Sequence, residues 1–141
     1  MPGEENKTIA RRYYAEAHDA GDVDLADRLL ASDYVHHSPF PGFSPDREGT
    51  KQSLALLHAA FPDLEFAVED MVSEEDRGAV RWSLRGTRLG EWRGIPASGD
   101  PIAITGMHFV RIERARIAEE WRNADTLALM QQTGVIPSRS T

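Results

Sequence analysis

The sequence predicts an α+β fold in which helices pack on one face of a strongly curved, mostly antiparallel sheet and enclose a pocket. Three observations predict it. Apolar residues recur at helical spacing in the first half, apolar residues alternate with period two in the second half, and glycines interrupt that second half. Glycines let long strands bend, and a bent sheet covered by helices leaves room for an apolar ligand.

Three helices are expected before the sheet. The first ends at Gly21, the second begins after the N-cap Asp22, and the third opens at Ser44, with Ser44 as N-cap, a first-turn proline and the first-turn acid Asp46. Pro62 ends the third helix. The expected helices span about 5–20, 23–30 and 45–61, and an extended piece at 34–37 precedes a loop at 38–43.

The second half is expected to form the sheet. Alternation predicts strands over 64–69, 80–85, 101–113 and 116–123, with a glycine-rich excursion at 89–100 and a terminal helix near 127–131. We find no repeat and no linker. The 141 residues therefore form one domain, residues 1–141, with an ordered core of about 5–136.

Composition excludes several classes of function. The 16 Lys and Arg against 23 Asp and Glu give a net charge of -7, which argues against nucleic-acid binding. No apolar run approaches the roughly 18 residues of a membrane span, and no signal-peptide profile is present, so a cytoplasmic location is expected. The absence of cysteine excludes thiolate chemistry. Catalysis would depend on His, Asp, Glu, Tyr and water.

His108 is the first candidate for a catalytic group. It lies in the strand expected over 101–113 at the same parity as Ile102, Ile104 and Val110, so its imidazole should point inward. An inward imidazole can hold or transfer a proton near neutral pH. The alternative is a core histidine hydrogen-bonded to a neighbour.

Asp125 is the second candidate. Counting with period two from Ile117 places it on the same inward face as Trp121, and a carboxylate at the edge of an apolar cavity can act as a base. It also precedes the expected last helix, where Asp is a preferred N-cap. Both interpretations stay open at this point.

Glu119 shares that parity and is a rival acid. Its alternative is an outward ion pair with Arg81 or Arg111. His36 and His37 are adjacent on an extended piece and point to opposite sides, so at most one can face a pocket. No pair of residues has metal-ligand spacing, and no metal is expected.

Aromatic side chains could line a pocket for an aromatic ligand, or could simply form the core. They are Tyr13, Tyr14, Tyr34, Phe40, Phe43, Trp82, Trp92 and Trp121.

Several short blocks occur in an order and spacing that resemble a known family. They are Phe61-Pro62-Asp63-Leu64, Arg81-Trp82 leading to Gly86-Thr87, Gly94-Ile95-Pro96-Ala97-Ser98-Gly99, Gly106-Met107-His108-Phe109, Ile117-Ala118-Glu119-Glu120-Trp121 with Asp125, and Gln131-Gln132-x-Gly134. From about Ile9 to Ile136 the chain resembles the SnoaL-like polyketide cyclases, which belong to the larger group of NTF2-like α+β cones.

The resemblance implies an intramolecular aldol cyclase that closes a ring on an aromatic polyketide ester without metal or cofactor. Asp125 matches the acid after the family's tryptophan and would be the base. His108 matches the histidine of the third strand and would be its partner or the proton donor. His37 matches a histidine near the pocket mouth. The expected substrate contacts are His37, Trp82, Glu119, Trp121, Tyr13 and Phe40.

Arg122 departs from the family pattern, because some relatives carry an acid directly after the tryptophan. Together with His36 and His37, this departure keeps open a hydroxylase-type or isomerase-like enzyme on the same fold, and a non-catalytic small-molecule-binding protein is the third possibility. The expected partner is a hydrophobic aromatic or polyketide molecule, not nucleic acid or membrane. A homodimer is expected, because an exposed sheet face with Trp and Leu needs cover.

Overall fold

The computed structural model describes residues 2–87, 89–91, 99 and 101–137. In chain order its elements are α1 (Pro2–Arg11), the π-helix η1 (Arg12–His18), α2 (Val23–Leu29), β1 (Leu30–His36), α3 (Arg47–Ala60), β2 (Glu65–Glu74), β3 (Arg77–Thr87), β4 (Pro101–Glu113), β5 (Arg116–Ala124) and α4 (Thr126–Gln132).

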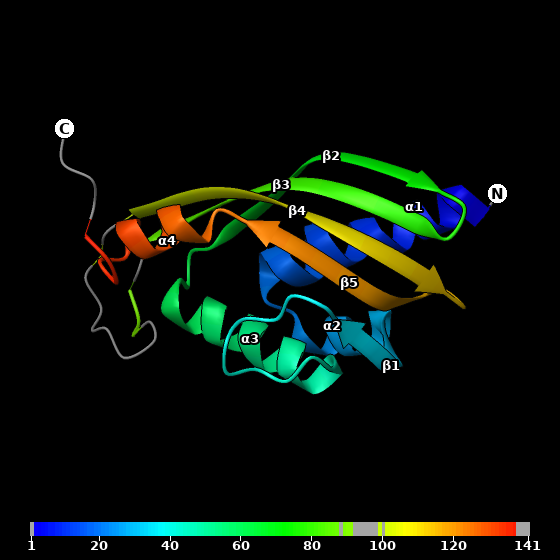
Figure 1. Cartoon of the computed structure of the whole chain (residues 1–141), viewed down its shortest axis with the longest axis horizontal. Helices are drawn as coiled ribbons and strands as arrows, with labels where there is room; N and C mark the ends of the chain where they lie inside the picture. The colour runs from blue at the N-terminus through cyan, green and yellow to red at the C-terminus, as the bar shows by residue number, and fades with distance from the viewer. Residues whose placement is uncertain (1, 88, 92–98, 100, 138–141) are drawn as a thin grey trace.

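One curved, unclosed sheet carries the fold. Its strand order is β1-β5-β4-β3-β2, with β2 to β5 antiparallel and β1 parallel to β5. The helices α1, α2 and α3 lie on one side of this sheet. Helix α4 follows β5 and lies against β4, at the left end of the sheet in Figure 1. The predicted α+β architecture of helices on a mostly antiparallel curved sheet is therefore confirmed. None of the described helices is both long and apolar enough to cross a bilayer.

The helix caps follow local sequence signals with one exception. The carboxylate of Asp22 accepts a hydrogen bond from Leu25 N over 3.0 Å, as predicted for an N-cap. The third helix is capped by Asp46, which accepts from Gly49 N over 2.9 Å. The predicted N-cap at Ser44 is wrong, because its hydroxyl instead donates to Asp46 and stabilises the capping side chain.

The first helix is longer than expected. It begins at Pro2, before the predicted ordered core, and passes directly into η1. The hairpin between β4 and β5 turns through Arg114 and Ala115, which both adopt positive φ, a conformation that usually favours asparagine or glycine. Of the predicted glycine-rich excursion, 92–98 and 100 lie outside the described residues, as does the tail after Pro137.

A β-bulge in β5 decides which residues face the helices. Arg111 pairs with Glu119 and the next residue, Ile112, pairs with Ile117, so Ala118 is an extra residue on β5. A single extra residue turns every following side chain to the opposite face. The inward face expected for Glu119 is consequently wrong, and the same holds for Trp121. Beyond the bulge, Glu120, Arg122 and Ala124 face inward.

Candidate functional site

A cavity lies between the helices and the concave face of the sheet. Part of its wall is apolar, with Leu54, Phe66, Leu84 and Ile104 among the lining side chains. Its polar and titratable lining residues are Tyr13, His18, His36, Thr50, Ser53, His108, Glu120, Arg122 and Thr126. A partly apolar enclosure with a few convergent polar groups is the usual form of a small-molecule site.

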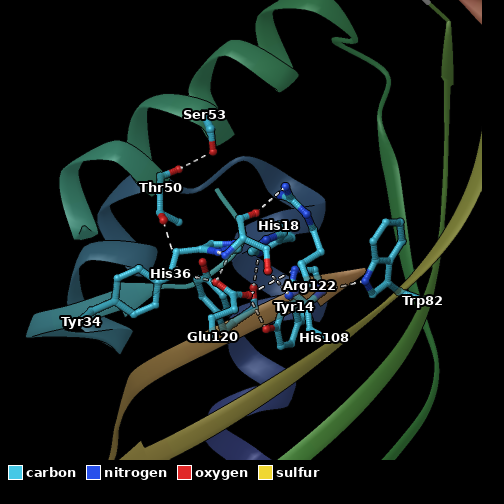
Figure 2. Close-up of polar contacts among 12 residues, drawn as sticks. Tyr14, His18, Tyr34, His36, Thr50, Ser53, Trp82, His108, Glu120 and Arg122 are labelled. Atoms are coloured by element: carbon cyan, nitrogen blue, oxygen red, sulfur yellow. Dashed lines mark hydrogen bonds and ion pairs between the residues drawn. The ribbon is translucent and has the colours of Figure 1, made fainter. Parts of the chain in front are cut away.

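Glu120 is the centre of the polar cluster and is only 1% exposed. The hydroxyl of Tyr14 donates to its Oε2 over 2.5 Å, and the hydroxyl of Tyr34 donates to its Oε1. Tyr34 in turn accepts from Thr50 Oγ1 over 3.3 Å. Figure 2 shows these side chains and two histidines turned toward the carboxylate. Because both oxygens have donors, a buried anion is stable here.

The protonation of His108 is fixed by its neighbour. Trp82 Nε1–H donates to His108 Nδ1 over 2.7 Å, and an indole nitrogen can only donate. The imidazole proton therefore resides on Nε2, which lies 3.3 Å from Oε2 of Glu120. Gly106 makes room for the indole that donates to His108, since a Cβ at this position would lie 2.2 Å from Cζ2 of Trp82.

His36 has the same tautomer for an analogous reason. The backbone N–H of Ser38 donates to its Nδ1 over 3.0 Å, so Nε2 carries the proton. That nitrogen lies 3.7 Å from Oε1 of Glu120, which is too long for a hydrogen bond. Among the described residues, the Nε2–H of His36 thus has no hydrogen-bond acceptor. The parallel pairing of β1 and β5, which aligns His36 with Glu120, places it there.

His18 has the opposite tautomer. Its Nδ1 lies 3.2 Å from the carbonyl oxygen of Tyr13, which can only accept, so Nδ1 carries the proton and Nε2 keeps its lone pair. In the described part of the chain Nε2 has no hydrogen-bond donor. His58 Nε2–H donates to the carbonyl of His18 over 2.6 Å and holds this end of η1 in place. Of the three histidines that line the cavity, His18 alone keeps a ring nitrogen lone pair with no donor among the described residues.

Burial favours the neutral form of the three histidines. Burial lowers the pKa of His18 to about 4 and that of His108 to about 3, although the charge of Glu120 opposes both shifts. Burial also lowers the pKa of His36. For Glu120, burial alone would raise the pKa, but His108, the other histidines and the Tyr14 hydroxyl outweigh it and hold the pKa well below its usual range. The cluster contains a carboxylate anion and neutral imidazoles.

Arg122 brings a cation to the same cavity. It follows the bulge on β5, pairs across the sheet with His108 and points inward. One of its terminal nitrogens donates to the carbonyl of Ser38 over 2.8 Å, and its guanidinium lies 3.9 Å from the ring centroid of Phe40. Burial lowers the pKa of Arg122, while the charge of Glu120 raises it.

The cluster could be taken for a metal centre, since ligand atoms of His36, His108 and Glu120 lie within 4.8 Å of one another. The donor set does not fit. A histidine that binds metal through Nε2 carries its proton on Nδ1 and donates it to an acceptor. Here Nδ1 of both histidines faces an N–H donor, from Trp82 and from Ser38, which places the proton on the nitrogen a metal would need.

The structure brings four of the expected site residues to the cavity and leaves four outside its lining. Those in the lining are His108, Trp82, Tyr13 and Phe40. Tyr13 contributes a buried hydroxyl without a hydrogen-bond partner in the described residues. Asp125 is exposed and caps α4, accepting from Ala128 N over 3.0 Å, which confirms the alternative interpretation of this residue as an N-cap.

The remaining three residues lie together on the outer face. The rings of His37 and Trp121 stack with centroids 4.5 Å apart, and His37 Nε2 lies 3.1 Å from Glu119. Glu119 also accepts from Arg111 Nε over 2.5 Å, so the ion pair considered as its alternative role is confirmed. Sequence reasoning missed Glu120, His18 and the role of Arg122. The period-two count missed Glu120 and Arg122 because the bulge at Ala118 reverses the face on which they lie.

Fold and site together define an NTF2-like α+β protein with an internal cavity. The sequence profile of the SnoaL-like polyketide cyclase family matches residues 8–133. The chain belongs to this family, as the resemblance predicted. No curated protein sequence matches it.

Solved structures agree with this assignment. TsrD from Streptomyces laurentii is 26% identical, with a TM-score of 0.82 over 94% of this chain and 97% of that one. IdmH from Streptomyces antibioticus, a proposed polyketide cyclase, is 31% identical, with a TM-score of 0.78 over 92% and 98%. AclR from Streptomyces galilaeus, a proposed hydroxylase, shares the fold at 23% identity, with a TM-score of 0.86 over 98% and 86%.

Proposed function

We propose that the cavity binds a small aromatic polyketide and closes a ring on it by a cofactor-free intramolecular aldol reaction. Family membership supports the class of reaction. The observation that carries the proposal is the pairing of opposite tautomers in one partly apolar cavity. His18 presents a free lone pair, His36 presents a free N–H, and the Glu120 anion lies beside the His36 N–H.

His18 is the proton acceptor in this scheme. Its Nε2 takes a proton from an acidified carbon, the resulting enolate carbon attacks a ketone carbon, and the carbonyl electron pair becomes an alkoxide. The N–H of His36 stabilises that alkoxide, which regains the proton first taken by His18. Atoms and charges balance without an oxidant. The charge of Glu120 favours the imidazolium that forms on His18.

The low basicity of His18 limits the substrate. A neutral imidazole whose pKa is held near 4 removes only a strongly acidified proton. A carbon between two carbonyl groups, whose enolate is delocalised into an aromatic system, fits this requirement. Such a substrate supplies most of the carbanion stabilisation, and the cavity contributes orientation and exclusion of water.

The Asp125–His108 pair expected from the resemblance stays a prediction. Asp125 would have to leave its cap on α4 to reach a substrate. Both nitrogens of His108 already face partners, Trp82 and Glu120, so its function in the proposed scheme is to position the carboxylate.

The experiment is turnover of an aromatic polyketide β-keto ester, followed by mass spectrometry in anaerobic buffer with a chelator. A ring-closed product with one water fewer or the same mass as the substrate supports the proposal. Binding of the ester without conversion would instead identify a binding protein. Neither outcome depends on which residue is the base.

A hydroxylase-type reaction is the second candidate, and Arg122 favours it. This chain has a cation at the inward position after Trp121, where some relatives carry an acid. Product formation that requires oxygen and adds an oxygen atom would support this candidate and contradict the first.

We also propose a homodimer formed through the outer sheet face. Met107 is 53% exposed and Phe109 is 43% exposed, and the ring of Phe109 packs edge-on against Trp121. Such an apolar patch favours association. Sedimentation across a concentration series tests this, and a monomer throughout would contradict it. The cytoplasmic location stays a prediction.

A further inference from the structure

Arg122 is a largely enclosed cation whose charge the surrounding protein does not neutralise by contact. No carboxylate of the described residues lies within ion-pair distance of it, and its guanidinium makes one hydrogen bond, to the carbonyl of Ser38, while its face rests on Phe40. A guanidinium has five N–H donors in a fixed plane. The other guanidinium donors have no acceptor among the described residues, and Arg122 lines the cavity.

Glu120 does not need Arg122 as a counter-charge. Its two oxygens accept hydrogen bonds from Tyr14 and Tyr34, and the N–H groups of His108 and His36 lie 3.3 Å and 3.7 Å away. The carboxylate is stabilised by this set of neutral donors. Glu120 and Arg122 thus interact through their charges without a direct hydrogen bond, and the cation is the one with donors to spare.

A half-buried cation that contacts no anion loses part of its hydration, and an anionic ligand offsets this cost. The geometry available is suited to an oxyanion, because a planar guanidinium binds carboxylates through two parallel hydrogen bonds. Ser38 and Phe40 hold the guanidinium in place before any ligand arrives, so little side-chain entropy is lost on binding. The same cavity has an apolar wall that includes Trp82, Phe66 and Ile104.

We propose that Arg122 forms an anion subsite and that the ligand of this cavity is a ring-bearing compound that carries a free carboxylate. This deepens the proposed function and rests on it only in taking the cavity as the ligand site. The carboxylate is a recognition group held by Arg122, separate from the carbon atoms that react near His18.

The test compares binding of 2-naphthoate and methyl 2-naphthoate by calorimetry. These probes share the ring system and differ in charge. The wild-type protein should bind the acid at least about tenfold more tightly than the ester, which is the effect of one charge-assisted hydrogen-bonded pair. Arg122→Gln should abolish the preference by weakening naphthoate binding alone, whereas Arg122→Lys should keep part of it.

Arg81→Gln is the matched control, since Arg81 is an exposed arginine on β3, two strands away from β5 in the same sheet, and is absent from the cavity lining. It should leave the preference unchanged. Circular dichroism on each variant separates loss of binding from loss of fold. Equal or tighter binding of the ester, binding of neither probe, or an undiminished preference in folded Arg122→Gln would overturn the proposal.

Failure of this proposal and failure of the cyclase can be told apart. Turnover of a polyketide ester by a protein that shows no preference for naphthoate would leave the cyclase standing and overturn the anion subsite. A strong preference for naphthoate that is lost in Arg122→Gln, without any turnover, would support the subsite and count against the cyclase.

Discussion

Trp82 fixes the tautomer of His108: the indole N–H donates to Nδ1 over 2.7 Å and thereby places the imidazole proton on Nε2, beside Glu120. Trp82→Phe removes this donor while keeping an aromatic ring. We expect Nδ1 of His108 to become partly protonated, which nitrogen-15 NMR detects directly from the ring chemical shifts. Trp121→Phe, on the outer face, is the control. An unchanged His108 spectrum in Trp82→Phe would contradict the assignment.

Gly106 makes room for the same indole. A methyl group at this position would lie 2.2 Å from Cζ2 of Trp82, so Gly106→Ala must displace the ring from His108. We expect a loss of about 1–3 kcal/mol in the free energy of unfolding, the usual cost of overpacking. Gly78→Ala is the matched control, because there the nearest atom is Val110 Cγ2 at 3.4 Å. Equal denaturation midpoints for the two variants would disprove this packing argument.

The hydrogen-bond donors around Glu120 need two acceptor oxygens, which only the carboxylate anion provides. Glu120→Gln would turn an amide N–H toward the hydroxyl of Tyr14 or Tyr34 and leave buried donors unpaired. We expect it to lower the free energy of unfolding by about 3 kcal/mol or more, as when one partner of a buried polar cluster is removed. Glu119→Gln, at the partly exposed pair with Arg111, should cost less than about 1 kcal/mol. Chemical denaturation of both variants measures the difference.

Stability should fall on mild acidification. The unfolded chain binds protons on His18 and His108 near pH 6.5, whereas in the folded chain their pKa values are about 4 and about 3. Their contribution is complete above pH 6.5 and is lost as the pH falls toward the folded values, because only the unfolded state gains protons in that window. The lowered pKa values of His36 and Glu120 act in the same direction.

Near pH 5, unfolding should therefore be accompanied by the uptake of about two protons from solvent, one on His18 and one on His108. The free energy of unfolding then falls by about 2.7 kcal/mol for each unit by which the pH is lowered. Denaturant titrations between pH 4.5 and 7.5 measure this slope. His108→Gln should reduce it by about one proton. A slope near zero between pH 7 and pH 5 would refute the neutral histidine cluster.

The sequence predicted the elements well and the site only in part. The alternation of apolar residues along β4 correctly predicted that His108 points inward. The N-cap at Asp125 was also predictable, because capping depends on a neighbour only three residues away. The bulge at Ala118 is not marked by a glycine or a proline. Counting with period two along β5 therefore selected Glu119 instead of Glu120 as the inward acid. The partnership of His36 with Glu120 depends on strand pairing across the whole chain, which no local pattern reports.

The central claim is that the proton acceptor lies in the cavity, at Nε2 of His18. The most direct measurement is the turnover number of His18→Gln and of Asp125→Asn on an aromatic polyketide ester that the wild-type protein cyclises. Asparagine is also a good N-cap, so Asp125→Asn keeps α4 capped. We expect a loss of about 100-fold or more for His18→Gln and near wild-type turnover for Asp125→Asn. The reverse result, with His18→Gln active and Asp125→Asn inactive, would contradict it.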